Sequence, residues 1–300
     1  GAPDGYKVSA TYADGFRAGH IWTMYGRDAD TKAERLAEAI FSRSSAILQQ
    51  VGLPDFTETS YEVIGAESHY GAARKVGSVR EVDVKIAAKH PSPKGIGVLL
   101  KEMVGMALTA PPGLTGFAGA RAKPSPVVRL FSMIVPKDQV AVTVDCEGES
   151  LECPDTVDRV FDQASISRHR LPEAAAEGDQ ITVPLESLAW GRSGDKGNKA
   201  NIGIIARHPD FLPARAAQIT EQRVADLFQH FLTADQPEPV ERFYMPGPSA
   251  FNFLLHDVLG GGGIASLRVD PQGKGYAQVL LAETVQLPAA LAEKHALVSS

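Results

Sequence analysis

Residues 188–203 read LAWGRSGDKGNKANIG, and this stretch organises the second half of the chain. Just before it, residues 181–185 alternate apolar and polar side chains, which predicts a half-buried strand. At its end lies Ala200–Ala206, a compact apolar segment that predicts a second strand. The polar residues 192–198 are therefore expected to form a glycine-rich loop between two strands.

The elements beyond this loop indicate the type of domain. Residues 224–231 carry apolar side chains at helical spacing, and Thr220 precedes them as a capping residue. Residues 240–245 and 250–258 are expected to be short strands. This order of strands around a helix is typical of a split ferredoxin-like arrangement.

The first half of the chain mixes strands and helices in a different order. Residues 6–12 and 16–25 predict two strands of a hairpin that turns at Asp14-Gly15. Thr31 and Glu34 fit a capping box, so a helix is expected to begin there and to continue to about Gln50. Such a mixture favours an α+β fold whose first domain is a layered α/β structure.

The length of 300 residues fits two domains. A second predicted helix follows Ser92-Pro93, a capping side chain before a proline at the first helical position. Beyond residue 146 the chain becomes polar and rich in Glu, Asp and Pro, as expected of a linker. The expected divisions are an α+β domain at 1–150, a linker at 151–178, the ferredoxin-like domain at 179–290 and a tail at 291–300.

Composition excludes several classes of partner. The net charge of -6 argues against nucleic acid, whose binding depends on neutralising phosphates with Lys and Arg. No run of about 18 apolar residues exists, so no membrane span is expected. Two cysteines, Cys146 and Cys153, do not form a disulfide framework, which favours a reducing, cytoplasmic location. No further Cys or His follows them at ligand spacing, and we expect no metal site.

Residues 192–198, Arg-Ser-Gly-Asp-Lys-Gly-Asn, combine groups that chemistry on an anionic substrate needs. Glycines let the backbone approach a ligand, and successive amides of such a turn can bind an anion. The expected catalytic residues are Asp195 as general acid or base, Ser193 as a hydroxyl donor and Lys196 as a point charge. The expected substrate-binding residues are Arg192, Gly194, Gly197, Asn198, Asn201, Asn252 and Gly261. The alternative is a tight hairpin connection whose charges face water.

Three further groups of residues have weaker claims to function. Asn252 lies between two phenylalanines and, on a strand, faces away from them, either completing the pocket or bonding the glycine run 260–263. Arg17 and His20 lie near two glycines at the entry to a strand, where a polar hairpin edge is the plainer interpretation. The glycine-rich segment 113–120 is expected to be a loop or a lid.

These motifs resemble those of the acyclic terpene utilisation (AtuA) family. Residues 188–203 are similar to the family hallmark A-R-S-G-D-K-G-x-x-x-N-I-G, with Gly191 where alanine is usual. Leu259–Gly262, together with residues 266–274, is similar to the family's closing segment. Residues 7–16, KVSATYADGF, resemble the middle part of its members, where K-V-S-x-x-Y-x-D-G is common.

The resemblance implies that the whole chain corresponds to the C-terminal half of a family member. The missing N-terminal domain would then come from a separate chain, or would have been cut away. Family members are associated with the catabolism of branched acyl-CoA intermediates, so one hypothesis is an oligomeric enzyme subunit of hydratase or lyase type. The other is a non-catalytic subunit that stabilises a partner chain carrying the chemistry. No cofactor is predicted, although coenzyme A is expected as part of the substrate.

Overall fold

The computed structural model describes residues 3–116, 119, 121–153, 162–173, 178–234 and 236–297. Part of the expected linker and part of the expected 113–120 lid lie outside these residues. The fold is α+β, as predicted. Within the described part of the chain, no helix is both long and apolar enough to cross a membrane.

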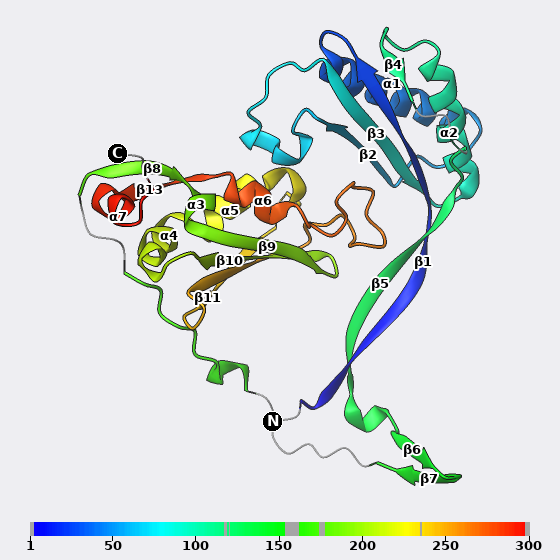
Figure 1. The fold of residues 1–300 in the computed structure, drawn as a ribbon. Helices are drawn as coiled ribbons and strands as arrows, with labels where there is room; N and C mark the ends of the chain where they lie inside the picture. The colour runs from blue at the N-terminus through cyan, green and yellow to red at the C-terminus, as the bar shows by residue number, and fades with distance from the viewer. Residues whose placement is uncertain are drawn as a thin grey trace.

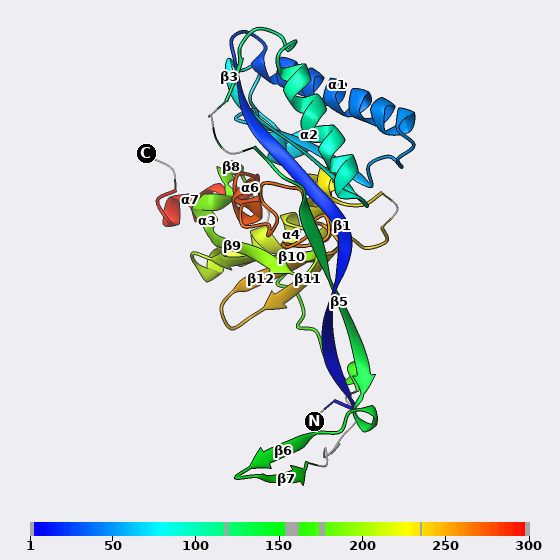
Figure 2. The same ribbon diagram turned by 90° about the vertical axis from the view of Figure 1, so that its right-hand side faces the viewer.

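The first half of the chain builds a sheet of order β2-β3-β1-β4, to which β5 is added along β1. Its elements are β1 (Gly5–Tyr25), α1 (Ala29–Gln50), β2 (Glu58–Ile64), the 3-10 helix η1 (Ser68–Ala73), β3 (Glu81–His90), α2 (Pro93–Ala107), β4 (Leu114–Thr115) and β5 (Ser125–Pro136). Figure 2 shows α1 and α2 side by side over one face of this sheet. Their buried side chains, including Leu36, Ile40 and Leu99, pack on Val84 and Ile86 of β3.

The two predicted helices of this domain exist, but only one starts where expected. Ser92 caps α2 by accepting a hydrogen bond of 3.2 Å from the amide of Lys94, as predicted. Helix α1 begins at Ala29, so the prediction of a capping box at Thr31 is wrong. Ala29 is fully buried and its amide donates to the carbonyl of Val79, so tertiary contacts extend the helix beyond its sequence signal.

The predicted hairpin at Asp14-Gly15 is also wrong, because β1 is one strand of 21 residues. Gly15 has a positive φ of 77°, but the chain makes a bulge there, between Ala13 and Phe16, and continues in the same direction. Residues 16–25 pair with β3, whereas residues 5–13 pair with β5 alone. The result is a two-stranded ribbon, residues 5–13 with 128–136, that extends away from the first domain (Figure 1). We call this ribbon the arm.

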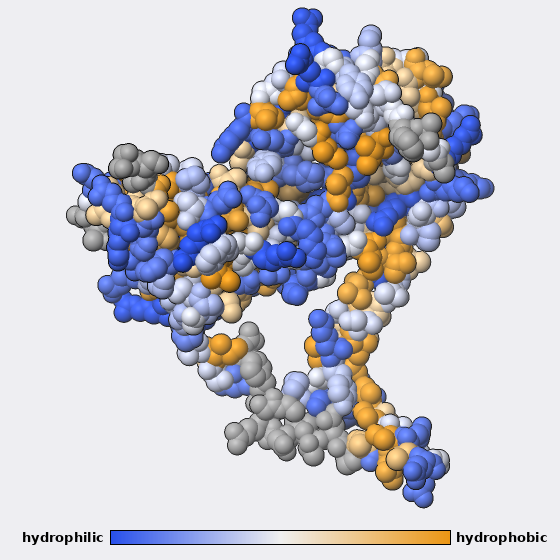
Figure 3. Space-filling view, in the orientation of Figure 1, coloured by the Kyte–Doolittle hydropathy of each residue, from blue (hydrophilic) through white to orange (hydrophobic). Residues whose placement is uncertain are grey.

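Short elements follow the arm. They are the 3-10 helix η2 (Lys137–Gln139), the hairpin of β6 (Thr143–Cys146) with β7 (Glu149–Glu152), and the 3-10 helix η3 (Gln163–Ser165). Both cysteines, Cys146 and Cys153, are exposed and free. Figure 3 shows apolar residues along the length of the arm, ending near a hydrophilic tip.

The second half builds a four-stranded antiparallel sheet of order β11-β12-β10-β9 and a two-stranded β8-β13 pair. Its elements are β8 (Gln180–Pro184), α3 (Leu185–Leu188), β9 (Ala189–Lys196), β10 (Lys199–Ala206), η4 (Pro209–Phe211), α4 (Leu212–Gln218), α5 (Glu221–Leu227), η5 (Gln229–Phe231), β11 (Val240–Met245), β12 (Ala250–Leu255), α6 (Tyr276–Leu281), β13 (Thr284–Pro288) and α7 (Ala289–Lys294). Thr220 caps α5 as predicted, accepting from the amide of Arg223 at 3.2 Å. Residues 289–294, where the sequence predicted the start of a loose tail, form α7.

Candidate functional site

The motif at 192–198 lies almost wholly in a strand. Strand β9 runs to Lys196, and its partner β10 starts at Lys199, so only Gly197 and Asn198 form the turn. Gly197 has a positive φ of 70°, which fits a two-residue hairpin turn with glycine at its first central position. The expected loop is therefore an extended hairpin, which is the plainer of the two sequence interpretations.

The pleat of β9 separates the motif into two faces, because successive side chains of a strand point to opposite sides. Gly191, Ser193 and Asp195 share the face that packs on α6, where a Cβ at Gly191 would come 2.9 Å from Leu281. Arg192 and Lys196 are exposed on the other face. The structure therefore does not bring Arg192 or Lys196 together with Ser193 or Asp195.

The outer face of the sheet carries the two predicted asparagines. Asn201 lies on β10 and Asn252 on the neighbouring β12, and the Asn201 amide donates to the Asn252 side-chain oxygen at 3.1 Å. Arg192 lies opposite Gly203, which in turn lies opposite Asn252. These three predicted binding residues, Arg192, Asn201 and Asn252, thus share one polar surface that is separate from Ser193.

Ser193 is buried and serves the fold. Its hydroxyl donates to the carbonyl of Lys274 at 3.1 Å and accepts from the amide of Ala277 at 2.9 Å. Ala277 lies in the first turn of α6, whose amides lack partners within the helix. Ser193 therefore caps α6 from a neighbouring strand, and its hydroxyl is fully engaged.

Asn198 and the glycine run are joined to each other. The Asn198 side chain accepts from the amide of Gly261 at 2.7 Å and donates to Asp257 at 3.1 Å. A Cβ at Gly262 would lie 2.7 Å from the carbonyl oxygen of Gly197, so only glycine fits there. The β9-β10 turn thus fixes the position of the segment that begins at Gly260.

Asp195 is close to the same segment. Its carboxylate lies 3.5 Å from the ammonium of Lys274, and a Cβ built on Gly263 would lie 3.9 Å from it. Gly194 leaves room for that lysine, because a Cβ there would come 3.2 Å from its nitrogen. Asp195 therefore lies directly behind Gly263.

Gly263 forms part of the wall of a cleft of about 900 Å³ between the two halves of the molecule. The opposite side is lined by residues of β1 and β3, Gly19 among them, and by residues of the segment 122–125. Basic side chains gather here: Arg17, His20, Lys85, Lys123 and Arg268 line the cleft. No Asp or Glu is among the described residues that line it.

Two of these cations donate hydrogen bonds to neutral acceptors, and neither has a carboxylate hydrogen-bond partner among the described residues. Arg17 on β1 donates to the carbonyl of Ser266 at 2.7 Å, linking the two walls. Arg268 donates to the carbonyl of Val258 and to the Tyr276 hydroxyl, the latter at 3.3 Å, and stacks 4.4 Å above the ring of Phe231. Burial raises the pKa of Tyr276 to about 12, so this hydroxyl stays neutral.

Lys85 differs because it has a carboxylate partner. Its ammonium donates to Glu62 at 2.5 Å, Glu62 also accepts from the amide of Val269, and the Nε2 atom of His69 lies 3.0 Å from the same carboxylate. Burial lowers the pKa of Lys85 in spite of this ion pair. Burial alone would raise the pKa of Glu62, but the contacts with His69 and Lys85 outweigh it and the pKa is lowered. The carboxylate is thus charged, and it holds the cleft segment to the first domain.

The arrangement can bind an anion. A cleft lined by one sign of charge concentrates ligands of the opposite sign, even in a protein whose net charge is -6. Sequence reasoning had identified Arg17 and His20 as weak candidates and had missed Lys85, Lys123 and Arg268. Those three lie in different segments without a shared motif, so only the tertiary structure brings them together.

Comparison with protein families gives two matches that do not overlap. A model of the acyclic terpene utilisation family protein AtuA matches residues 1–146, and a model of the AtuA ferredoxin-like domain matches residues 183–286. The second match covers the four-stranded sheet and agrees with the ferredoxin-like fold predicted from the sequence. No curated protein and no solved structure matches the chain.

Proposed function

Because the chain belongs to the acyclic terpene utilisation family, we propose that it is part of an enzyme that acts on branched, carboxylated acyl-CoA intermediates, as a hydratase or lyase. The observation that carries this proposal is the basic cleft without a lining carboxylate. Coenzyme A supplies phosphates and a carboxylated acyl group supplies a further anion. A volume of about 900 Å³ lies within the usual range for small-molecule sites.

We assign different roles to the residues that line the cleft, according to their positions. Arg17, Lys123 and Arg268 bind phosphate or carboxylate oxygens, for which guanidinium and ammonium groups are the usual partners. His20 lines the cleft directly and is the titratable group best placed for proton transfer. Asp195, the acid or base expected from the sequence, lies behind Gly263 and pairs with Lys274. It acts on a ligand only if the glycine segment moves aside.

The test is a binding measurement with coenzyme A by isothermal titration calorimetry. Lys123→Ala is the informative variant because Lys123 is exposed, and its loss leaves the fold intact. We expect about fivefold weaker binding, since one exposed charge pair contributes up to about 1 kcal/mol. The matched control is Lys199→Ala, a lysine on β10 that does not line the cleft.

Two outcomes contradict the proposal. Pantetheine lacks the phosphates of coenzyme A. Equal affinity for the two compounds would show that the basic cleft does not bind the phosphates. An equal loss of affinity in Lys199→Ala and Lys123→Ala shows that binding depends on overall charge. Binding that weakens steeply with salt in the wild type, and less steeply in Lys123→Ala, supports it.

The arm supports a second candidate function. In this alternative, the chain is a non-catalytic subunit that stabilises a partner chain, and the partner carries a further domain. An isolated two-stranded ribbon is only marginally stable in water. Large apolar side chains are exposed along it: Phe131 is 55% exposed, Met133 44% and Tyr12 50%. The register places Phe131 opposite Ala10 and Met133 opposite Val8, so these residues share one face.

The mass of the native complex distinguishes the two functions. A second polypeptide that co-purifies with the wild type and is lost with Phe131→Ser, while coenzyme A binding is unchanged, supports an assembly role for the arm. A wild-type monomer contradicts that role. The cleft and the arm are tested by different variants, so either proposal can fail alone.

A further inference from the structure

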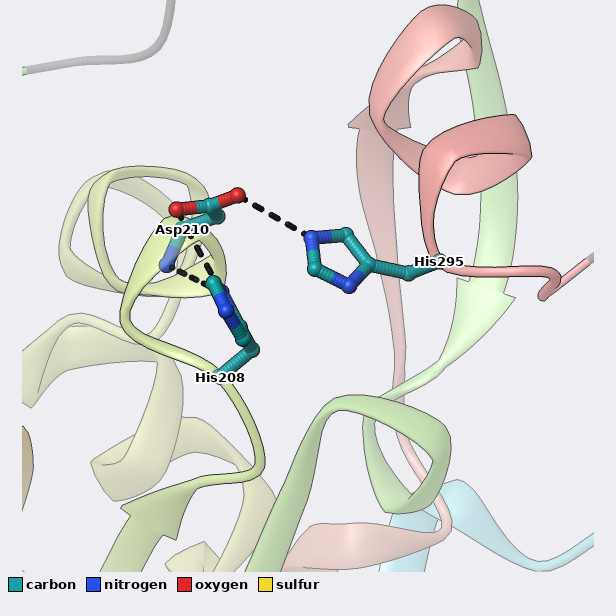
Figure 4. A group of neighbouring side chains, drawn as sticks. All are labelled: His208, Asp210 and His295. Atoms are coloured by element: carbon teal, nitrogen blue, oxygen red, sulfur yellow. Dashed lines mark hydrogen bonds and ion pairs between the residues drawn. The ribbon is translucent and has the colours of Figure 1, made fainter.

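Three potential metal ligands lie close together in the second half of the chain, and none of them lines the cleft. His208 and Asp210 flank the start of η4, and His295 directly follows α7. One nitrogen of each histidine and one carboxylate oxygen all lie within 4.8 Å of one another. Figure 4 shows that the carboxylate of Asp210 contacts both imidazole rings.

The distances are close to those of a coordination sphere. The His208 Nδ1 atom lies 3.3 Å from one carboxylate oxygen of Asp210, and the His295 Nε2 atom lies 3.0 Å from the other. Zinc binds such ligands at about 2.0–2.2 Å in tetrahedral geometry, which separates neighbouring ligand atoms by about 3.3 Å. Small side-chain rotations are enough to direct all three atoms at one ion.

Contacts within the cluster and with one residue outside it, Phe211, hold these side chains in place. The His208 Nδ1 atom caps η4 by accepting from the amide of Asp210 at 3.2 Å, so an ion bound at this nitrogen would replace that hydrogen bond. The His295 ring packs on Phe211, with ring centroids 4.7 Å apart, and on His208 at 4.4 Å. His295 is the most buried of the three ligands, with 17% of its side chain exposed. Preorganised ligands of this kind lose little freedom when an ion binds.

The position of Lys294 indicates that the cluster attracts a cation. Its ammonium lies 2.7 Å from the same oxygen of Asp210 that His295 contacts, and 63% of its side chain is exposed. Because most of its side chain is exposed, the lysine can swing into solvent and leave the carboxylate to an incoming ion.

We propose that His208, Asp210 and His295 form a binding site for one Zn²⁺ ion, with Lys294 as the cation that the metal displaces. Two imidazoles and one carboxylate are a ligand set that suits zinc, with water at the fourth position. The ion joins the end of α7 to the connection between β10 and α4. It thereby fastens the last described helix of the chain to the sheet.

The experiment titrates ZnCl₂ into the untagged protein at neutral pH by isothermal titration calorimetry, with Co²⁺ as a spectroscopic substitute. We expect one ion per chain and the visible absorption of tetrahedral Co²⁺. His208→Gln and His295→Gln should each weaken binding at least 10–100-fold, the range that loss of even an outer-shell partner costs. His256→Gln is the matched control, because His256 bonds to a carboxylate, Glu241 at 2.8 Å, outside this cluster.

Lys294→Met provides the second test, and it removes no ligand. It should strengthen zinc binding several-fold, because the competing ammonium is gone while the apolar stem remains. Circular dichroism of each variant shows whether the fold persists. Zinc binding that is absent from the wild type, unchanged in His295→Gln, or no tighter in Lys294→Met overturns the site and leaves an ion-pair cluster only.

Discussion

Replacing Ser193 by alanine separates a structural role of this residue from a chemical one. Ser193 is 5% exposed, and its hydroxyl satisfies both the amide of Ala277 and the carbonyl of Lys274. Lys274 is an exposed residue, but Ala277 is 1% exposed and its amide loses the one partner that it has among the described residues. A buried donor left unsatisfied costs about 1–3 kcal/mol, and a helix cap typically about 1 kcal/mol. We expect the free energy of unfolding of this domain to fall by about 2 kcal/mol.

The most specific assay is the hydrogen-exchange rate of the Ala277 amide, because this amide reports on the opening of α6. A loss of about 2 kcal/mol corresponds to roughly thirtyfold faster exchange. Ser187→Ala is the control: Ser187 is half-buried, and its hydroxyl donates to the carbonyl of Pro184 at 2.7 Å in an exposed hydrogen bond, so its change should stay within about 0.5 kcal/mol. Unchanged exchange at Ala277, together with lost turnover on an acyl-CoA substrate, would refute the structural role. It would indicate instead that Ser193 takes part in the reaction.

Three further predictions concern other parts of the molecule. Gly262→Ala should lower the thermal unfolding temperature markedly, because φ is +85° and the new methyl group would lie 2.7 Å from a backbone carbonyl of the β9-β10 turn; an unchanged temperature contradicts the close packing. Glu62→Gln should lower the free energy of unfolding by about 3 kcal/mol in denaturant titration, because it leaves the ammonium of Lys85 buried without its ion pair. A decrease of less than about 1 kcal/mol would argue against a stabilising role of that pair. The pKa of Asp210 is lowered to about 2, so its ion pairs stabilise the fold above about pH 4 and are lost as the pH falls toward 2. Asp210→Asn should remove this part of the acid dependence in a pH titration of stability.

The sequence predicts elements well where the signal is local. Ser92 caps α2 and Thr220 caps α5, since a capping side chain and its amide lie within three residues of each other. The signal at Asp14-Gly15 is equally local, but it is ambiguous, because glycine at positive φ suits both a turn and a bulge. Pairing with β5, more than 110 residues later in the chain, decides in favour of the bulge.

The candidate site was harder to predict than the fold. The sequence places Arg192, Ser193, Asp195 and Lys196 next to one another, but the pleat of a strand sends neighbours to opposite faces. Once the run is a strand instead of a loop, its charges cannot converge on one ligand. The cleft shows the opposite relation: Arg17, Lys85 and Arg268 are distant in the sequence and converge only because β1, β3 and the glycine segment meet.

The hairpin motif and the cleft are nevertheless physically connected. Asn198 holds the amide of Gly261, and the Gly197 carbonyl leaves no room for a side chain at Gly262. From there the chain reaches Ser266, whose carbonyl accepts from Arg17, and Arg268, which lines the cleft. A change at Asn198 should therefore alter ligand affinity at the cleft without removing any group that touches the ligand. On this view the polar motif acts as the support of a binding wall, and its strict geometry follows from packing rather than from catalysis.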